Sequence, residues 1–321
     1  MDRIAVLLVN LDQWELTRQC LDSLMASRGV SVHPMLVDNG SSTPVPDWVQ
    51  EYPNLRLMRF PENLGFTGGN NRAFGLFDND EIPWTFVLNN DTTVEPDTLM
   101  LLVDAVREWP DAGISTPAVF YAERPDLVWS AGGTLRRLRM VFHHRTYPDR
   151  QSLPERPVET GFASGCAMMM ASDTYGRLGG FREGFFIYHE DTLMCLRCLR
   201  SGMKIVLEPR AEVLHHVSVT TGGVMSPFSI YFTHRNRFLA AAEELSPAEM
   251  GLFAVYYLAV TCLKTLTFPL RGHWRSVRWM WRAALDGIRG IEGGVPAGLR
   301  RGGRVTQGRR RERKSGRSFG E

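Results

Sequence analysis

The sequence predicts an α/β fold in which a mostly parallel central sheet is flanked by helices and followed by a helical C-terminal extension. Two observations support this prediction. Apolar segments of strand length alternate with amphipathic segments of helix length over residues 4–109, and polar residues stand where the strands end. Strands that alternate with helices favour a parallel sheet covered on both faces. The 321 residues, 44% of them hydrophobic, are enough for one such domain and an appended segment.

The predicted elements of the first third follow that alternation. Short apolar runs bounded by turn-forming residues predict strands at residues 4–9, 35–37, 55–60 and 84–88. Apolar residues at helical spacing predict helices at residues 14–28, 67–77 and 96–109, and a glycine loop precedes the second helix. The third helix has proline at its first position, where a missing N–H is tolerated.

The rest of the chain is less regular and divides by composition. We expect a hairpin or excursion at residues 127–147, a buried strand at 161–170 and a short helix at 192–200. Helical patterns resume at residue 226 and give way to Gly and Arg from residue 290. The predicted units are therefore an α/β domain (1–245), a helical extension that is a candidate for membrane association (246–299) and a basic, disordered tail (300–321).

Three polar residues mark one edge of the predicted sheet. Asn10, Asp38 and Asp91 each stand at the carboxyl end of a strand. Ligands of such sheets bind in the crevice beyond the carboxyl ends of the strands. We therefore expect these residues to surround one crevice.

Five segments carry a resemblance to a known family. They are Asn10, residues 37–41 (VDNGS), 63–71 (NLGFTGGNN), 88–92 (LNNDT) and 188–191 (YHED). In this order they resemble the motifs of family-2 glycosyltransferases, and the similarity to bacterial rhamnosyltransferase-like members covers roughly residues 3–240. The resemblance implies a GT-A fold and inverting transfer of a sugar, with rhamnose as a family-level guess, from a UDP- or dTDP-sugar to a glycan or lipid-linked acceptor in cell-surface polysaccharide synthesis.

The resemblance also implies a set of donor-binding residues. Asp38 can accept hydrogen bonds from the base or ribose, although it can equally cap the turn that follows it. Glycines let the backbone approach a ligand, and the N-terminus of a helix favours anions; an ordinary turn before a helix is the alternative. Arg235 belongs to a later family pattern and is interpreted as a ligand contact, or otherwise as helix-surface charge. The expected donor-binding residues are Asn10, Asp38, Asn39, Gly65, Gly68, Gly69, Asn70, Asn90 and Arg235.

Asp91 and His215 are the predicted metal ligands, and Mg²⁺ or Mn²⁺ is the expected cofactor. A divalent cation can neutralise the charge of a leaving diphosphate, and hard oxygen ligands suit these ions. Many relatives have Asp-x-Asp where this chain has Asn89-Asn90-Asp91, so one carboxylate remains and the diphosphate must supply much of the coordination. His215 opens a late family motif that continues to Gly222; its imidazole can ligate manganese when neutral or pair with phosphate when charged. Helix capping by Asp91 and a purely structural His215 are the alternatives.

Glu190 and Asp191 are the predicted catalytic acids. An inverting transfer needs a base that takes the acceptor proton, and a partly apolar environment can raise a carboxyl pKa toward that task. The resemblance gives Asp191 the role of base and Glu190 a supporting role. Acidic residues also favour helix N-termini for electrostatic reasons alone, which is the alternative.

The C-terminal region predicts contact with a membrane. Residues 250–270 contain one charge, Lys264, and would extend about 31 Å as a helix, the length of a span. Arginines follow directly, so crossing would violate the positive-inside tendency, and we expect a helix that lies in the inner leaflet interface with nearby tryptophans, while a true span stays open. Residues 300–321 carry nine Arg or Lys and two Glu, a net +7, which leaves −5 of the whole-chain +2 for the other 299 residues. Such a tail fits anionic lipid better than nucleic acid.

The remaining observations concern the compartment and rival functions. Five sparse cysteines fit a reducing compartment, and no signal peptide precedes the first strand, so we expect a cytoplasmic protein at the inner face of the membrane. A non-catalytic nucleotide-sugar-binding protein of the same fold and a sugar nucleotidyltransferase are the rival functions. The intact Asp38, Asp91 and Asp191 argue against the first, and the lack of a basic triphosphate loop after Val9 argues against the second.

Overall fold

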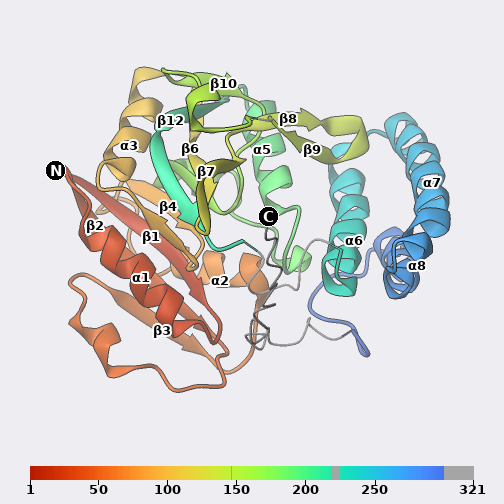
Figure 1. The fold of residues 1–321 in the computed structure, drawn as a ribbon, viewed down its shortest axis with the longest axis horizontal. Coiled ribbons are helices and arrows are strands. Elements are labelled where there is room, and N and C mark those ends of the chain that lie inside the picture. The colour runs from red at the N-terminus through yellow and green to blue at the C-terminus, as the bar shows by residue number, and fades with distance from the viewer. Residues whose placement is uncertain (146, 218–224, 300–321) are drawn as a thin grey trace, which may run out of the picture.

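A ten-stranded mixed sheet forms the centre of the molecule (Figure 1). The computed structural model describes residues 1–145, 147–217 and 225–299. The sheet order is β10-β12-β6-β11-β4-β1-β2-β3, with β5 added on β12 and β7 on β6, while β8 and β9 form a separate hairpin. The predicted α/β fold with flanking helices and a helical C-terminal region is confirmed.

The strands and helices have the following bounds. The strands are β1 (Asp2–Asn10), β2 (Val30–Asn39), β3 (Arg56–Phe60), β4 (Trp84–Leu88), β5 (Thr92–Val94), β6 (Ala112–Tyr121), β7 (Arg124–Ser130), β8 (Gly133–Arg136), β9 (Val141–His144), β10 (Val158–Thr160), β11 (Ala167–Ala171) and β12 (Lys204–His215). The α-helices are α1 (Trp14–Met25), α2 (Gly65–Phe74), α3 (Thr98–Glu108), α4 (Ser172–Arg177), α5 (Glu190–Arg200), α6 (Pro227–Glu244), α7 (Pro247–Leu270) and α8 (Trp274–Ile288). The 3-10 helices are η1 (Asp47–Glu51), η2 (Arg137–Arg139), η3 (Arg150–Ser152) and η4 (Glu183–Phe185).

Alternate residues of β1 face two different cores, as the period of a strand requires. Ile4, Val6 and Leu8 pack with α1 and α3, whereas Ala5 and Leu7 pack on the side of α2, α4 and α5. All five side chains are fully buried. The sheet is therefore covered on both faces, which is why its central strands are continuously apolar.

Parallel pairing brings the predicted crevice residues to one edge. Strands β3, β2, β1 and β4 run parallel, with Asn10 beside Asp38 and Asp38 beside Arg59. The direction reverses at β11, which pairs antiparallel with both β4 and β6. The sheet is thus parallel around the crevice and mixed beyond it.

Several element boundaries differ from the sequence-based expectation. Helix α2 begins at Gly65 and ends at Phe74, so the expected glycine loop forms its first turns. Helix α3 begins at Thr98, two residues after the expected proline. The expected strand at 161–170 is regular only from Ala167, and α5 already begins at Glu190. Strands β5, β6 and β12 had no predicted counterpart.

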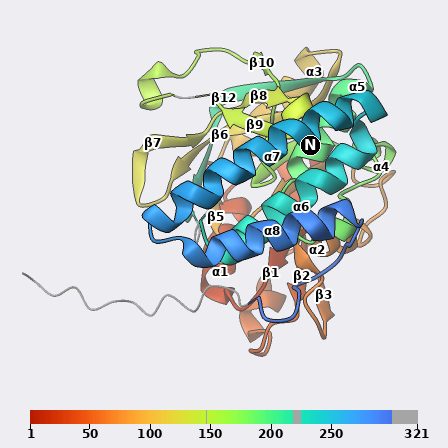
Figure 2. The ribbon, with the colours of Figure 1, turned by 90° about the vertical axis from the view of Figure 1, so that its right-hand side faces the viewer.

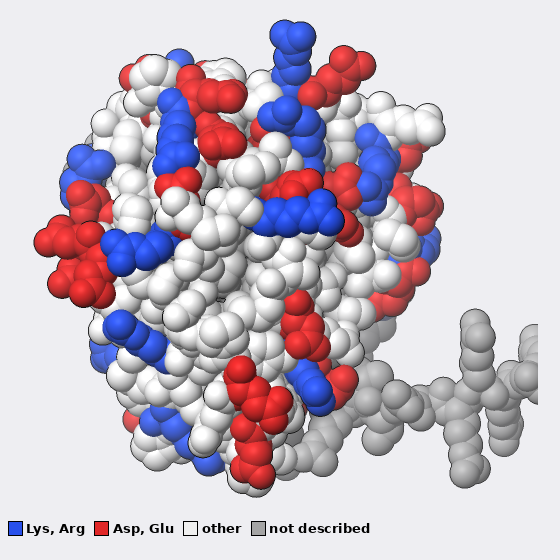
Figure 3. Space-filling model, turned by 90° about the vertical axis from the view of Figure 1, so that its left-hand side faces the viewer, with Lys and Arg blue, Asp and Glu red and all other residues white. Residues whose placement is uncertain are grey.

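The helices α6, α7 and α8 lie side by side as an outer layer (Figure 2). Within the described ranges, α7 is the one helix long and apolar enough to cross a membrane, judged by length and composition alone. The predicted boundary at residue 245 falls between α6 and α7. The opposite side of the molecule shows Lys and Arg interspersed with Asp and Glu (Figure 3). The predicted tail of residues 300–321 and the motif residues 218–222 lie outside the described residues.

The close packing of α2 on β1 generates a prediction about Gly69. A Cβ at Gly69 would lie 2.8 and 2.9 Å from the two γ-carbons of Val9, whose β-branched side chain is stiff at χ1. We expect Gly69→Ala to destabilise the protein by roughly 1–3 kcal/mol, as overpacked sites do. Gly176→Ala is the matched control, because that helical glycine is exposed with nothing within 4 Å, and it should be stabilising by about 0.5–1 kcal/mol. Urea unfolding midpoints of the two variants measure the difference, and equal midpoints would contradict the packing argument.

Candidate functional site

Asn10 joins the ends of three strands through its side-chain amide. Its Nδ2 donates to Ser41 Oγ at 3.2 Å, and its Oδ1 accepts from Thr17 Oγ1 at 3.0 Å. Asn90 Nδ2 lies 3.4 Å from the same Oδ1 and donates to Thr17 Oγ1 at 2.9 Å. Asn10, Asn90 and Thr17 are buried, so this network fixes the carboxyl end of β1 against α1 and the segment that follows β4.

Asp38 is fully buried at the end of β2 and faces Arg59. Its Oδ1 accepts from the backbone N–H of Ser41 at 3.1 Å, which is the turn-capping contact. Arg59 Nε lies 3.0 Å from Oδ2 as an ion pair, although the geometry is not that of an aligned hydrogen bond. Oδ2 therefore keeps acceptor capacity for a ligand donor.

Asn39 organises the segment that leads into α2. Its Nδ2 donates to Gly65 O at 2.9 Å and to Asn63 Oδ1 at 3.2 Å, and its Oδ1 accepts from Leu64 N at 2.9 Å. Gly65 has a φ of +78°, and a Cβ there would lie 2.3 Å from the carbonyl oxygen of Phe186. Only glycine fits this close approach between the start of α2 and the Phe186 backbone.

The other residues of the glycine-rich segment are also tightly packed. A Cβ at Gly68 would meet Leu64 Cβ at 2.9 Å, and Gly69 abuts Val9. Asn70 Nδ2 donates to Phe66 O at 2.9 Å, while its buried Oδ1 has no partner in the described part of the chain. Each glycine contact is with the protein itself, so the glycines have a packing reason that the sequence pattern did not reveal.

Asp91 and His215 lie together although 123 intervening residues separate them. The antiparallel pairing of β5 with β12 places His215 opposite Thr92, and His215 Nε2 lies 3.2 Å from Asp91 Oδ1. Both side chains are buried, Asn89 Nδ2 lies 3.4 Å from the same ring nitrogen, and Trp129 packs edge-on against the imidazole. The sequence-based pairing of these two residues thus has a geometric basis.

The Asp91–His215 pair fits a divalent cation in part. Two ligands on one octahedral ion at about 2.1 Å would be about 3 Å apart, close to the observed 3.2 Å. Asp91 Oδ1 and His215 Nδ1 are buried without an aligned hydrogen-bond partner in the described structure. Within residues 1–145, 147–217 and 225–299, however, no group of three His, Cys, Asp or Glu side chains could hold a metal. The chain supplies two ligands, and the rest must come from the bound molecule or water.

The charge of His215 depends on its neighbours. Burial disfavours the imidazolium, but Cys166 and the Asp91 carboxylate together raise the pKa of His215 to about 10. A pKa this high favours the charged imidazolium beside Asp91. Such a pair can donate to a phosphate directly, or it can exchange its proton for a cation.

The turn at Gly165–Cys166 connects this pair to the two predicted catalytic acids. Gly165 N donates to Asp191 Oδ2 at 3.3 Å. The next carbonyl, Cys166 O, accepts from Asn89 N at 2.9 Å, and the Cys166 thiol contacts His215. The Asp91–His215 pair and the Glu190–Asp191 pair therefore lie on either side of one short turn. This shared contact with the turn was not predicted.

Glu190 and Asp191 lie in the first turn of α5, and both carboxyl groups have raised pKa values. Burial and the neighbouring Asp191 raise the pKa of Glu190 well above its usual range. Burial also raises the pKa of Asp191, to about 6, and hydrogen bonds from Gly165 and Thr192 limit the rise. The pKa of about 6 brings Asp191 close to neutral pH, where a general base works well.

Arg235 holds the backbone before these acids. Its guanidinium is buried and donates to Gly184 O, Phe185 O and Gly293 O at 3.0, 2.8 and 2.7 Å. Its Nε donates to Asn236 Oδ1 at 2.9 Å, so all of these contacts are internal. These hydrogen bonds tie helix α6 to the η4 segment, and Arg235 makes them with groups of the protein itself.

Three further residues make contacts at the candidate site and are not among the expected site residues. Asn236 Nδ2 lies within 3.0 Å of the carbonyls of Phe185, Ile187 and Tyr188, and it fixes the segment that precedes Glu190. Arg59 pairs with Asp38, and Cys166 contacts His215. Asp38 and Arg59 carry opposite charges on neighbouring strands, but their pairing could be predicted only with knowledge of the strand register.

Comparison with known proteins identifies relatives of the chain. A family model described as glycosyl transferase family 2 matches residues 5–176. The chain is 34% identical over 223 residues to the N-acetylglucosaminyl-diphospho-decaprenol L-rhamnosyltransferase of Mycobacterium tuberculosis, which covers 62% of this chain and 71% of that protein. It is 27% identical over 150 residues to the dTDP-rhamnosyl transferase RfbF of Shigella flexneri, covering 44% of this chain and 49% of the relative.

A solved structure shares the fold at low sequence identity. The crystal structure of GalNAc-T7 with UDP, GalNAc and Mn²⁺ superimposes with a TM-score of 0.54 and 13% identity. The match covers 78% of this chain, and the chain spans 54% of that structure's length. The GT-A-like architecture expected from the sequence is confirmed by this likeness.

The raised pKa of Asp191 has a consequence for stability. Its folded pKa of about 6 exceeds the ordinary 3.8, so stability is fully present below pH 3.8 and is lost as pH rises through 6. We expect Asp191→Asn to melt at the parental temperature near pH 4 and at a higher temperature above pH 7, by up to about 3 kcal/mol in unfolding free energy. Thermal melts across this pH range test it, with the exposed Asp173→Asn as control. A melting difference that does not vary with pH would contradict the buried-charge interpretation.

Proposed function

Because the chain belongs to glycosyl transferase family 2, we propose that it transfers a sugar, with inversion at the anomeric carbon, from a UDP- or dTDP-sugar to a hydroxyl of a glycan or lipid-linked acceptor. Glycosyltransferase activity in polysaccharide synthesis follows from the family and from the rhamnosyltransferase relatives. The donor sugar, the acceptor, the roles of the site residues and the need for a metal are parts of the proposal.

The arrangement around the Gly165–Cys166 turn carries the proposal. Asp91 and His215, which would hold the diphosphate end of the donor, lie on one side of this turn, and Asp191, the proposed base with a pKa of about 6, lies on the other. Transfer of a sugar from a nucleotide diphosphate needs both functions within one site, since negative charge develops on the leaving group while a proton leaves the acceptor.

In the proposed reaction, Asp191 takes the proton of the acceptor hydroxyl. The acceptor oxygen forms a bond to the anomeric carbon from the face opposite the leaving group, and the bond from that carbon to the diphosphate oxygen breaks with its electron pair. Burial beside Asp191 raises the pKa of Glu190 and so favours its neutral form, which suits a supporting role beside the base. Asn236 and Arg235 keep both acids in place through the backbone of residues 184–188.

Asp91 and His215 would hold the diphosphate end of the donor. A Mg²⁺ or Mn²⁺ ion bound by them would stabilise the charge of the leaving diphosphate. Asp38 Oδ2 would accept from the base or ribose, and Asn10, Asn39 and Asn90 would support the crevice. The glycines and Asn70 would shape the start of α2 rather than touch the ligand at their α-carbons.

The relatives support a rhamnose donor and a lipid-linked acceptor. One relative's name specifies a diphospho-decaprenol acceptor and L-rhamnose, and another specifies a dTDP-rhamnosyl donor. We propose the same classes for this chain: a dTDP- or UDP-linked deoxyhexose and an acceptor carried on a lipid diphosphate.

We also propose that the protein works in the cytoplasm, on the inner face of the cell membrane, through α7 and α8. The outward side of α7 is entirely apolar, with Leu252, Val255, Leu258, Leu263 and Leu266 more than half exposed. The inward side holds Tyr257 and Lys264, both in contact with His234 of α6. A spanning helix would strip Lys264 of that partner in hydrocarbon, at about 2.5–3.5 kcal/mol for the charge on insertion scales. This supports a helix lying in the leaflet interface, with the basic tail adding attraction to anionic lipid.

Loss of the proposed base should reduce turnover but not donor binding. Asp191→Asn is nearly isosteric, and transfer should fall about 10²–10⁴-fold. In the parental enzyme, kcat/KM should fall as pH drops below about 6, because a protonated Asp191 cannot accept the acceptor proton. A screen of nucleotide sugars for diphosphate release, with and without Mn²⁺, supplies the assay, and Asp173→Asn is the control. Donor affinity that falls in parallel with turnover would instead assign Asp191 a binding or structural role.

The membrane pose can be tested with the native cysteines. Cys262 lies on the exposed side of α7, and the other four cysteines are buried. Vesicles rich in phosphatidylglycerol should slow modification of Cys262 by a water-soluble maleimide at least tenfold, whereas Ser201→Cys, on the exposed end of α5, should stay reactive in a Cys262→Ser background. The variants Leu252→Cys and Leu270→Cys should both react with the maleimide once salt detaches the protein from the vesicles. In an interfacial helix, both positions stay on the outer side of the vesicle. If one of these two cysteines is reached only from the vesicle interior, α7 spans the bilayer and the interfacial pose is wrong.

A further inference from the structure

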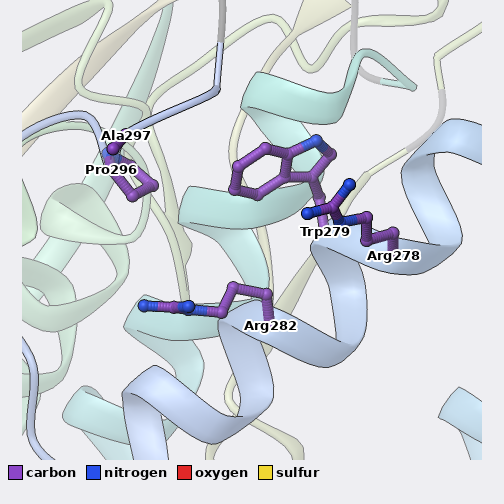
Figure 4. A pocket seen from close by; sticks show the side chains of 5 residues that line it. All are labelled: Arg278, Trp279, Arg282, Pro296 and Ala297. Atoms are coloured by element: carbon purple, nitrogen blue, oxygen red, sulfur yellow. The ribbon is translucent and has the colours of Figure 1, made fainter.

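A cavity of about 230 Å³ lies between α8 and the segment that follows it (Figure 4). Its lining consists of Arg278, Trp279, Arg282, Pro296 and Ala297. Trp279 and Arg282 project from α8 toward Pro296 and Ala297 (Figure 4). The cavity is thus a basic and aromatic site, apart from the carboxylates of the proposed catalytic centre.

The two arginines have free hydrogen-bonding capacity. Arg282 Nε donates to both oxygens of Asp286 at 2.9 and 2.8 Å, and its terminal nitrogens have no partner among the described residues. Asp286 is buried and also accepts from Tyr231 OH at 2.9 Å. This fixed carboxylate holds Arg282 in place through its Nε. Within the same part of the chain, Arg278 has no carboxylate partner. One turn apart on α8, the two guanidinium groups can present planar donors to one anion, as phosphate recognition by arginine requires.

An aromatic cluster connects the cavity to the proposed base. Trp279 packs edge-on against Tyr231, with ring centroids 5.9 Å apart. The same cluster contains Phe186, Ile187 and Tyr188, which immediately precede His189, Glu190 and Asp191. A ligand bound against Trp279 therefore sits beside the segment that positions the proposed base.

The cavity also borders the apolar surface of the helical layer. Besides the exposed leucines of α7, α8 exposes Trp274, Trp281, Leu285 and Ile288. Trp281 Nε1 donates to Thr265 Oγ1 of α7 at 2.9 Å, which joins the two helices into one surface. A molecule with an anionic head and a hydrocarbon chain would find a guanidinium pair and an apolar surface on the same helix.

We propose that this cavity binds the diphosphate of a lipid-linked acceptor, with its hydrocarbon chain on the α7–α8 surface and its sugar directed toward Asp191. The proposal rests on the proposed function for the identity of the acceptor. The acceptor's diphosphate stays attached to its sugar, whereas the donor's diphosphate departs as the leaving group, so this site needs positive charge and shape but no catalytic group. Arg278 and Arg282 supply the charge, and Trp279 supplies the wall.

The test compares two exposed arginines of α8 in the full-length protein. Arg278→Gln removes a cavity residue that has no partner to lose, and Arg275→Gln removes the same charge outside the cavity. Binding of farnesyl diphosphate in detergent micelles is measured by calorimetry. Farnesol tests the contribution of the hydrocarbon chain alone, and inorganic pyrophosphate tests that of the diphosphate alone. Arg278→Gln should weaken farnesyl diphosphate about tenfold, a typical loss for one charge-assisted hydrogen bond. Arg275→Gln should change it less than twofold, pyrophosphate should compete, and farnesol should bind without regard to either substitution.

Two results would overturn the site. Equal weakening by both substitutions would reduce the effect to general electrostatic attraction, and parental affinity in Arg278→Gln would remove the arginine from recognition. The binding measurement needs no turnover, so it stands even if the parental protein transfers no sugar to any lipid acceptor, an outcome that would defeat the proposed function alone. In an active enzyme, Arg278→Gln should raise the KM for a lipid diphosphate acceptor about tenfold while kcat and the donor KM stay at the parental values.

Discussion

The site depends on a short stretch of strained backbone that α6 holds in place. Phe186, Tyr188 and His189 have φ values of 65°, 70° and 68°, a region that costs residues with a Cβ of order 1 kcal/mol or more each. Asn236 and Arg235 donate to the carbonyls of this stretch and offset that cost. Helix α5 starts directly after it, so the placement of Glu190 and Asp191 is decided by contacts from a different helix. Gly65 completes the arrangement by letting α2 approach the Phe186 carbonyl.

Helix α6 therefore belongs to both parts of the molecule. On one side it holds the segment that precedes the acids. On the other side Tyr231 bonds Asp286 of α8, and His234 contacts Tyr257 and Lys264 of α7. Removing α7 and α8 would leave polar side chains of α6 without partners and expose its apolar ones. The helical layer is thus continuous with the site, although sequence composition divides the chain after residue 245.

The sequence predicted the crevice better than the contacts within it. Strand periodicity located Asn10, Asp38 and Asp91 at strand ends, because burial on both faces leaves a clear apolar run before each. The pairing of His215 with Asp91 has its physical basis in β5 and β12, two strands that were not predicted, since β5 is three residues long and β12 contains charged residues. The packing function of Gly65 and Gly69 could not be predicted, because it depends on Phe186 and Val9, which local sequence does not bring near. The same holds for Asn236, whose partners are backbone carbonyls and leave no trace in side-chain patterns.

The two-sided character of α7 links membrane attachment to folding. Its uncharged outer side becomes a continuous surface only when Tyr257 and Lys264 have turned inward to His234. The unfolded chain has no such surface, so a bilayer would act as a ligand of the native state alone. By mass action such a ligand stabilises the state that it binds, by RT ln(1 + [L]/Kd). Lipid affinity and the stability of the helical layer are then thermodynamically linked. A substitution that removes the contacts of Tyr257 or Lys264 with His234 should weaken both.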